Sequence, residues 1–176
     1  QNGFDVLVHS PAAWTHPGVA VAAARAGGVG VLDLEFSTDA AMAAAHFARL
    51  LSAVDGRIGL RVTPETPAAA RAILEAAPRD RDLVLIAAGP VSDLGNLVSN
   101  MRASRVGAND SLWLELNTAD ADISGIAADG IIARGFEAPG WGGEDSAYIL
   151  VQKLLRATSL PILVRGGLGI HSAGAV

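Results

Sequence analysis

The sequence predicts an α/β fold in which parallel strands form a (β/α)8 TIM barrel, with seven βα units visible and the last unit truncated or missing. Short apolar runs alternate with Ala-rich segments of helical character along the whole chain. Hydrophobic residues make up 51% of the chain but aromatic residues only 5%. A core of Ala, Val, Leu and Ile is typical of helices packed on buried parallel strands.

Seven apolar runs are predicted as strands, and six segments between them as helices. The strands begin near residues 5, 29, 57, 82, 112, 130 and 160. The helical segments cover residues 16–28, 39–54, 66–78, 93–107, 119–128 and 145–159. Asp39, Thr66 and Asp145 are predicted N-caps, and Pro17 and Pro67 fit first helical turns.

Strand and helix periodicity leaves two architectures open, an open doubly wound sheet and a barrel that lacks one unit. The final stretch "RGGLGIHSAGAV" is predicted as a strand, a loop and the start of a helix. An eighth βα unit would complete a barrel. We therefore expect residues 1–176 to be a single, incomplete barrel domain and a fragment of a larger multidomain chain.

Charged residues alternate with apolar ones toward the end of several strands. Asp33 and Glu35 share one face of the second strand, and Arg61 lies on the matching face of the third. The same face of later strands carries the remaining polar candidates: Glu115, Asn117, Arg134 and Arg165, with His9 ending the first strand. Carboxyl ends of barrel strands carry active sites.

Two pairs are predicted neighbours across the strands: Glu35 with Arg61, and Glu115 with Arg134. One alternative is that these pairs only neutralise each other inside a small barrel. For the whole set a pocket is favoured, because burying ions costs several kcal/mol each and an apolar filling would avoid that cost.

Glycine-rich loops follow the sixth and seventh strands, as "GFEAPGWGG" and "RGGLG". Glycine lets the backbone approach a ligand closely, and free N–H groups beside a helix N-terminus form an anion site. Barrels commonly bind phosphate on the loops after their last two strands. We expect Gly166 and Gly167 in such a cradle, with Arg165 adding charge.

Three segments carry a resemblance to a known family: "ARAGGVGVLDL", "DGIIARGFEAPGWGG" and "LPILVRGGLG". In this order and spacing they resemble the FMN-dependent barrels of the nitronate monooxygenase family, which includes flavin enoyl reductases. The opening stretch "FDVLVHSPAAWTHPGVAVAAARAGGVGVLDLEF" is similar to barrel domains of modular polyketide synthases.

The resemblance implies that FMN is the cofactor and indicates which residues would hold it. The candidate cofactor-binding residues are Gly135, Glu137, Ala138, Gly140, Arg165, Gly166 and Gly167. The candidate catalytic residues are Trp141, His9, Arg61 and Arg134. Trp141 stands where the family has a histidine, and an indole offers one N–H donor and no group that titrates near neutrality. Nitronate oxidation itself is therefore not expected.

Composition and charge argue against several classes of protein function. The net charge of −5 without a basic patch argues against nucleic-acid binding, and no apolar run is long enough to span a membrane. The chain has no cysteine and no metal-ligand spacing, so no metal is expected. A cytoplasmic location is the default expectation.

The favoured function is an FMN-binding oxidoreductase, an enoyl-thioester reductase-type domain of a polyketide or fatty acid synthase. Its expected electron donor is NADPH or NADH, and its expected partners are an acyl thioester or other small molecule and the other synthase domains. Two alternatives stay open: a catalytically silent structural or docking barrel, and a barrel that binds a phosphorylated small molecule without flavin.

Overall fold

A computed structural model describes residues 6–14, 16–105, 109–140, 142–167 and 169. Seven parallel strands form one sheet in the order in which they occur along the chain. They are β1 (Leu7–His9), β2 (Val29–Asp33), β3 (Ile58–Val62), β4 (Leu83–Ala88), β5 (Ser111–Leu116), β6 (Gly130–Arg134) and β7 (Ile162–Arg165). The sequential order confirms the barrel-type prediction, because a doubly wound sheet reverses its strand order partway.

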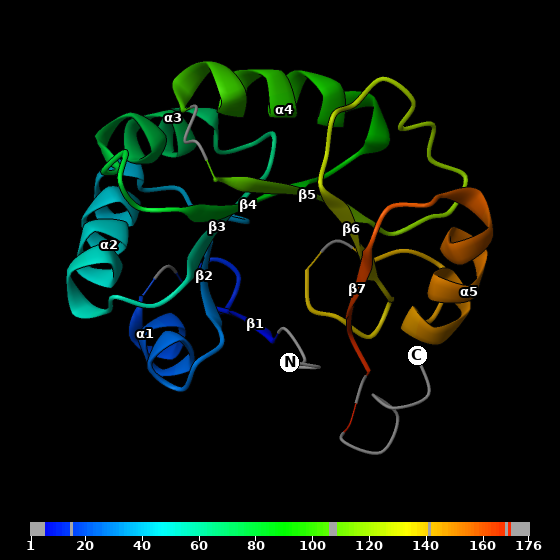
Figure 1. The fold of residues 1–176 in the computed structure, drawn as a ribbon, viewed down its shortest axis with the longest axis horizontal. Coiled ribbons are helices and arrows are strands. Elements are labelled where there is room, and N and C mark those ends of the chain that lie inside the picture. Colours follow the sequence, from blue (N-terminus) through cyan, green and yellow to red (C-terminus); the bar gives the residue numbers. More distant parts are fainter. Residues whose placement is uncertain (1–5, 15, 106–108, 141, 168, 170–176) are drawn as a thin grey trace.

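The helices lie on the outside of the curved sheet, which forms an open C in Figure 1. They are α1 (Gly18–Arg25), α2 (Ala40–Ala53), α3 (Pro67–Ala76), α4 (Val91–Ser104) and α5 (Ala147–Ala157). Asp39 caps α2 as predicted, accepting a hydrogen bond from the Met42 N–H at 2.9 Å. No described helix has the length and apolar character needed to cross a membrane.

One predicted helix and one predicted cap, Asp145, are wrong, whereas Thr66 is at the N-cap position of α3 as predicted. Residues 117–129 run from β5 to β6 without a helix, because the Asp122 carboxylate accepts from both the N–H and the hydroxyl of Ser124 and forms a turn instead. Thr66 makes no side-chain cap. Ser146 rather than Asp145 caps α5, and Asp145 pairs with Lys153 at 2.7 Å.

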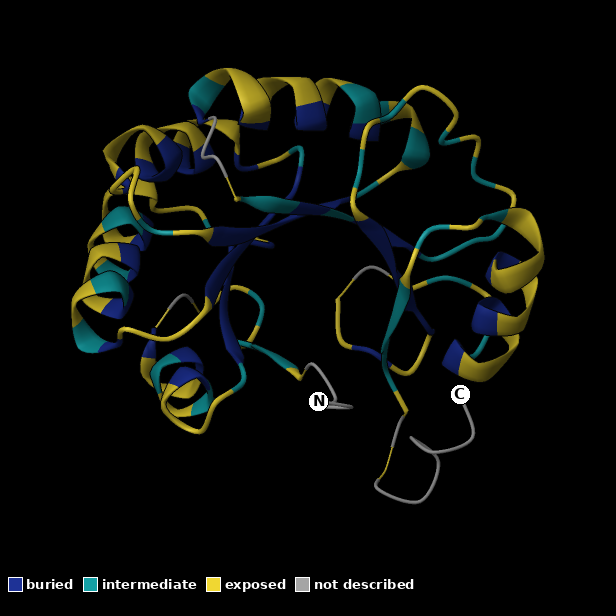
Figure 2. Cartoon of the chain, in the orientation of Figure 1, coloured by how far each residue is buried: buried dark blue, intermediate teal, exposed yellow. Residues whose placement is uncertain are grey.

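Hydrophobic packing occurs on both faces of the sheet. Between strands and helices lies the larger core, so the strands are buried while the outer helix faces are exposed (Figure 2). Inside the C is a smaller apolar layer of inward-facing residues: Val29, Val31, Val84, Ile86 and Ile132, with Leu7, Trp113 and Leu163 packed against it. A Cβ on Gly130 would lie 2.3 Å from the Trp113 ring, so this glycine makes room for the indole.

The two edges of the sheet differ from its centre. Every residue of β2, β3, β4 and β6 is buried, whereas β1 and β7 are only partly buried. In the described part of the chain β1 pairs only with β2, and β7 only with β6. The seven units therefore form a curved sheet with a gap where an eighth unit would stand in a complete barrel.

A buried arginine fixes the amino-terminal side of the sheet. Arg105 follows α4 and is 2% exposed. Its guanidinium donates to the carbonyls of Ala77 and Pro78, both at 3.0 Å, and to the carbonyl of Arg81, and it pairs with Asp110 at 2.7 Å. Sequence patterns did not single out this residue, because a lone arginine after a helix normally stays in solvent.

Replacing Arg105 by alanine should therefore destabilise the fold strongly. The change leaves several buried carbonyls and a partly buried carboxylate without their donor, at an expected cost of about 3 kcal/mol in the free energy of unfolding. Urea unfolding followed by circular dichroism measures it. Arg71→Ala, which removes an exposed arginine paired within α3, is the control and should change little. Equal effects of the two substitutions would contradict this role for Arg105.

Candidate functional site

Above the inner apolar layer, the carboxyl ends of the strands carry a second layer that is charged. It consists of His9, Asp33, Glu35, Arg61, Glu115, Arg134 and Arg165, which we call the charged layer. Inward-facing residues alternate along each strand, so the positions that continue the apolar layer toward the carboxyl end belong to this second layer. The strand register places Asp33 beside Arg61 and Arg134 beside Arg165.

Arg61 is the centre of the charged layer and is only 1% exposed. Its guanidinium contacts Asp33 at 2.8 Å, Glu35 at 3.0 Å and Glu115 at 2.7 Å. The bond to Glu115 is bidentate, because Nε also donates to that carboxylate at 3.1 Å. The three carboxylates come from β2, the loop after it and β5, so one side chain links both halves of the sheet.

Two further arginines complete the charge balance. Arg134 contacts Glu115 at 3.2 Å and Glu35 at 3.8 Å. Arg165 contacts Glu115 at 2.7 Å and Asp33 at 3.3 Å, which joins edge strand β7 to β2 across the interior. The predicted pairs, Glu35 with Arg61 and Glu115 with Arg134, are both confirmed as neighbours. Three carboxylates therefore face three guanidinium groups.

His9 lies at the edge of the charged layer, with a side chain that is 10% exposed. Its Nδ1 is 3.8 Å from Asp33 Oδ2, too far for a hydrogen bond, and has no other hydrogen-bond partner among the described residues. Asp33 is held firmly: its N–H donates to Ser10 Oγ at 2.9 Å, and its Oδ1 accepts from the Glu35 N–H at 2.9 Å.

Burial and neighbouring charges shift the pKa values of this layer. Burial lowers the pKa of His9, and the nearby Asp33 carboxylate only partly opposes this effect. Burial alone would raise the pKa of Asp33 and of Glu115. The Arg61 guanidinium and the Glu35 N–H outweigh it at Asp33, and Arg61 and Arg165 outweigh it at Glu115, so both pKa values lie below their usual range. Near pH 7 the layer thus holds a neutral His9 imidazole beside the ionised carboxylates of Asp33 and Glu115.

A cavity of about 310 Å³ lies at the carboxyl ends of β4, β5 and β6. It is lined by Gly89, Pro90, Glu115, Asn117, Arg134 and Gly142. Arg134 Nε is buried without a hydrogen-bond partner among the described residues, although the same guanidinium donates to the Pro139 carbonyl. Polar groups that converge on a cavity at this end of the strands are the arrangement expected of a binding site.

The loop after β6 packs over the charged layer, and its glycines contact the chain itself. Gly140 has a φ of +95°, and a Cβ there would lie 2.2 Å from a Glu35 oxygen and 2.4 Å from Arg134. Gly143 approaches the Asn117 carbonyl in the same way, at 2.2 Å. Gly142 has open space around its Cβ position, with no atom closer than 4.0 Å. Close packing within the chain thus requires glycine at positions 140 and 143, which is a different reason from the close approach of a ligand.

Glu137 connects this loop to helix α5 and to the loop after β7. Its carboxylate accepts from the Ala147 N–H at 3.1 Å, at the positive end of α5. A Cβ on Gly167 would lie 3.0 Å from Glu137 Oε1, and one on Gly166 would lie 3.0 Å from the Ala138 nitrogen. Gly166 and Gly167 have φ values of +111° and +58°, the left-handed turn that glycine favours.

The predicted site residues thus fall into three groups. His9, Arg61, Arg134 and Arg165 meet in the charged layer, and Gly140 packs against this layer at Glu35 and Arg134. The remaining candidates lie where the two glycine loops touch: Gly135, Glu137, Ala138, Gly166 and Gly167. Trp141 lies outside the described residues. Arg165 turns inward to Glu115 and Asp33, so its charge is already paired rather than directed at a phosphate. Sequence reasoning missed Gly89 and Pro90 of the cavity, for which no motif gives a signal.

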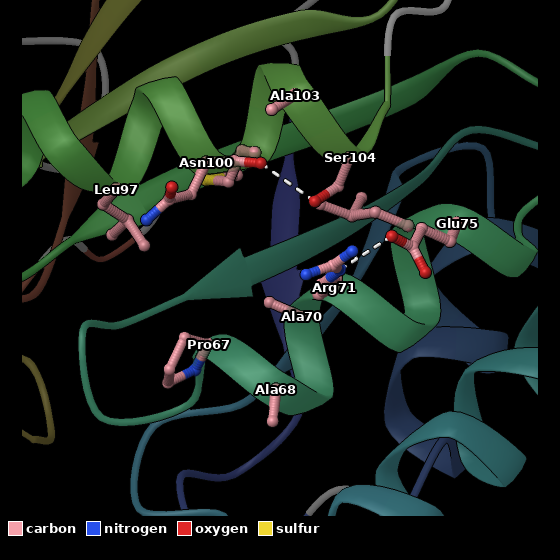
Figure 3. A pocket seen from close by; sticks show the side chains of 11 residues that line it. Pro67, Ala68, Ala70, Arg71, Glu75, Leu97, Asn100, Ala103 and Ser104 are labelled. Atoms are coloured by element: carbon pink, nitrogen blue, oxygen red, sulfur yellow. Dashed lines mark hydrogen bonds and ion pairs between the residues drawn. The ribbon is translucent and has the colours of Figure 1, made fainter.

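A larger groove, of about 510 Å³, lies between α3 and α4 on the outside of the sheet (Figure 3). Several of its polar side chains are partnered: Arg71 pairs with Glu75 at 2.8 Å, and the Ser104 hydroxyl donates to the Asn100 carbonyl at 2.9 Å. The groove is lined by residues of α3 and α4 and by none of the charged layer. We therefore place the candidate site at the smaller, charged cavity.

The strand order and the layered interior define the chain as a TIM-barrel-type α/β protein that lacks a final unit. Solved structures share this fold, among them the following. FabK from Thermotoga maritima superposes with a TM-score of 0.71 at 20% identity, over 93% of this chain and 51% of that one. A point mutant of the same protein gives the same score and identity, over 93% of this chain and 54% of that one.

Nitroalkane oxidase from Streptomyces ansochromogenes superposes with a TM-score of 0.63 at 18% identity, over 92% of this chain and 58% of that one. The chain therefore spans a little over half the length of the structures it matches. No protein-family model matches the chain, and no curated protein matches it in sequence. At sequence identities of 18% to 20%, the similarity to these structures shows the fold alone.

Stability should depend on pH in two steps. The pKa of folded His9 is lowered, so the unfolded chain binds its proton more readily and stability falls as the pH drops below about 6.5. Asp33 and Glu115 have depressed folded pKa values, so their contribution is lost as the pH falls below about 4. Urea unfolding between pH 8 and pH 3 measures both steps. His9→Gln should remove the upper step alone, and an unchanged upper step would contradict the assignment.

The Arg61→Met variant should be less stable than any variant in which an exposed arginine is replaced. It leaves three buried carboxylates without their shared partner, at an expected cost of about 3–5 kcal/mol at pH 7. Arg61 helps to hold the pKa of Asp33 and Glu115 low, so without it these two carboxylates should protonate more readily, and the difference from wild type should shrink as the pH is lowered toward 4. Thermal unfolding of Arg156→Met, at an exposed position of α5, provides the comparison. A loss no larger than in this control would show that the charged layer is dispensable.

Proposed function

We propose that the chain is an FMN-binding oxidoreductase barrel of the enoyl-thioester reductase type, with its site at the carboxyl ends of the strands. The observation that carries the proposal is the cavity lined by Arg134, Asn117 and Gly142, directly above a buried charged layer. The shared fold with FabK and nitroalkane oxidase supports it, as does the resemblance of the glycine loops to flavin barrels.

The described residues fit a flavin at two places, the turn after β7 and the cavity beside Arg134. The left-handed turn at Gly166 and Gly167 fits a phosphate, because it exposes main chain at the end of β7. The space around Gly142 and the buried guanidinium of Arg134 fit a polar ring edge beside the cavity. Arg165 adds no free charge, since both of its contacts are carboxylates. The fit thus rests on main-chain groups and Arg134.

The roles of the chain's own residues follow from this placement. Gly166 and Gly167 would hold the phosphate, and Arg134 would donate hydrogen bonds to a carbonyl or ring oxygen at the cavity. Bound FMN would supply the capacity to carry a hydride between a nicotinamide donor and the substrate. A neutral His9, positioned beside Asp33, would exchange protons at the edge of the layer. We further propose an acyl thioester as substrate and the other domains of a larger synthase as partners.

A second candidate function is a catalytically silent structural barrel. The pairing within the charged layer favours it, because three carboxylates and three guanidinium groups neutralise each other without any ligand. Contact of Gly140 and Gly143 with the chain itself points the same way. The two candidates differ in one measurable property, the binding of FMN.

Titration of the intact protein with FMN, followed by the loss of flavin fluorescence, tests the proposal. We expect saturable binding at micromolar FMN. Gly142→Val should weaken it at least about tenfold, since it fills the cavity with little conflict in the folded chain. Gly95→Ala, in α4 and equally without close neighbours, should leave FMN binding unchanged. Absence of FMN binding by the wild-type protein would overturn the proposal and favour the silent barrel.

A further inference from the structure

Exposed aromatic residues gather in the loops at the carboxyl ends of the strands. Trp14 follows β1, Phe36 follows β2 and Phe136 follows β6, and they are 62%, 50% and 56% exposed. Aromatic residues make up only 5% of the chain, so three of them in loops at one end of the sheet is an uneven distribution. The other large exposed apolar residues lie mainly on helices, among them Val19, Met42, Tyr148, Ile149 and Leu155.

The backbone beneath two of these aromatics is strained. Within the described residues, Ala13 and Phe36 are the only non-glycine residues with positive φ, at +63° and +61°. Phe36 should face the helices with Leu32 and Leu34 by strand alternation, but this conformation leaves it half exposed instead. A bulky residue in the left-handed region costs of order 1–3 kcal/mol, and such strain concentrates at ligand sites.

One hydrogen bond joins the two strained loops. The Ala13 N–H donates to the Glu35 carbonyl at 2.7 Å, so Trp14 and Phe36 each follow directly on one end of this bond. Glu35 also contacts Arg61 at 3.0 Å, which ties the pair of loops to the charged layer below. The backbone segments that carry the two aromatics are therefore joined to each other at the carboxyl ends of β1 and β2, and the Trp14 ring also lies 5.8 Å from the ring of His16, measured between centroids.

The charge of the layer below indicates what these rings could hold. Asp33, Glu35 and Glu115 balance Arg61, Arg134 and Arg165, so the layer has no excess of either sign. A charged group would lose hydration here without a counter-charge to replace it. An uncharged apolar group would instead gain from burial against the aromatic faces.

We propose that Trp14 and Phe36 form an aromatic platform that binds an uncharged apolar group of the substrate, of the acyl or aryl class. This inference rests on the proposed function only in calling that ligand a substrate. The platform itself depends on the exposed rings, the strained backbone and the neutral layer.

Tryptophan fluorescence tests the platform directly. In the protein with Trp113→Phe and Trp141→Phe, Trp14 is the sole tryptophan. Octanoyl-N-acetylcysteamine, an uncharged thioester, should change its emission saturably, and octanoate, with the same chain but a charged end, should bind at least about tenfold more weakly. Phe36→Ala should weaken thioester binding about tenfold or more, whereas Leu155→Ala should leave it unchanged. No saturable change with the thioester would overturn the proposal.

A second measurement tests the strain and is independent of any ligand. Phe36→Gly and Phe36→Ala both remove the ring, but only glycine relaxes a φ of +61°. The glycine variant should therefore have the higher melting temperature of the two, with thioester binding weakened in both. A lower melting temperature for the glycine variant would contradict a strained Phe36.

Parallel titration with FMN separates this inference from the proposed function. Thioester binding without FMN binding would leave the platform standing and remove the flavin. FMN binding without a change in Trp14 emission on addition of the thioester would support the flavin and overturn the platform. A Trp14 signal that instead depends on protein concentration, with dimers seen by sedimentation, would show that a second copy covers the rings, and would overturn the proposal.

Discussion

The ion pairing of one guanidinium with three carboxylates is the interaction on which the rest of this structure depends. Arg61 is almost wholly buried and reaches Asp33, Glu35 and Glu115. Buried ions are tolerated only when they are paired and hydrogen-bonded, and removal of one partner leaves the others uncompensated. Arg134 and Arg165 extend the pairing to β6 and β7, so the carboxyl ends of the sheet are held together from the inside as well as through their backbone ladder.

This internal pairing limits which groups at the carboxyl ends of the strands are free to contact a ligand. Because the layer is neutral and most of its donors are engaged, the proposed ligand would be contacted by main-chain groups, by the cavity-facing side of Arg134 and by the aromatic side chains around the loops. The close approach of Gly140 to Glu35 and Arg134 brings the loop after β6 down onto the layer. The floor of the candidate site is thereby formed by paired ions, and its walls by glycine-rich and apolar segments.

Much of the architecture could be predicted from the alternation of residues along the strands. The polar positions Asp33, Arg61 and Glu115 repeat on the inward face, and the pairs Glu35–Arg61 and Glu115–Arg134 follow from neighbouring strands, whereas Arg61 reaches Glu115 across β4. Alternation says nothing about irregular backbone, which is why Phe36 and the turn at Asp122 were not anticipated. The inward turn of Arg165 and the burial of Arg105 depend on distant chain segments, and single-sequence patterns carry no information about such contacts.

The Trp113 indole occupies the space that the missing side chain of Gly130 leaves, and this affects how a molecule can reach the interior of the sheet. Together with Val31, Val84 and Ile132 it plugs the interior beneath the ions. Among the described residues, the amino-terminal end of the interior is therefore closed by apolar side chains, and a molecule would reach the buried arginines from the carboxyl ends of the strands or between the unpaired edges of β1 and β7.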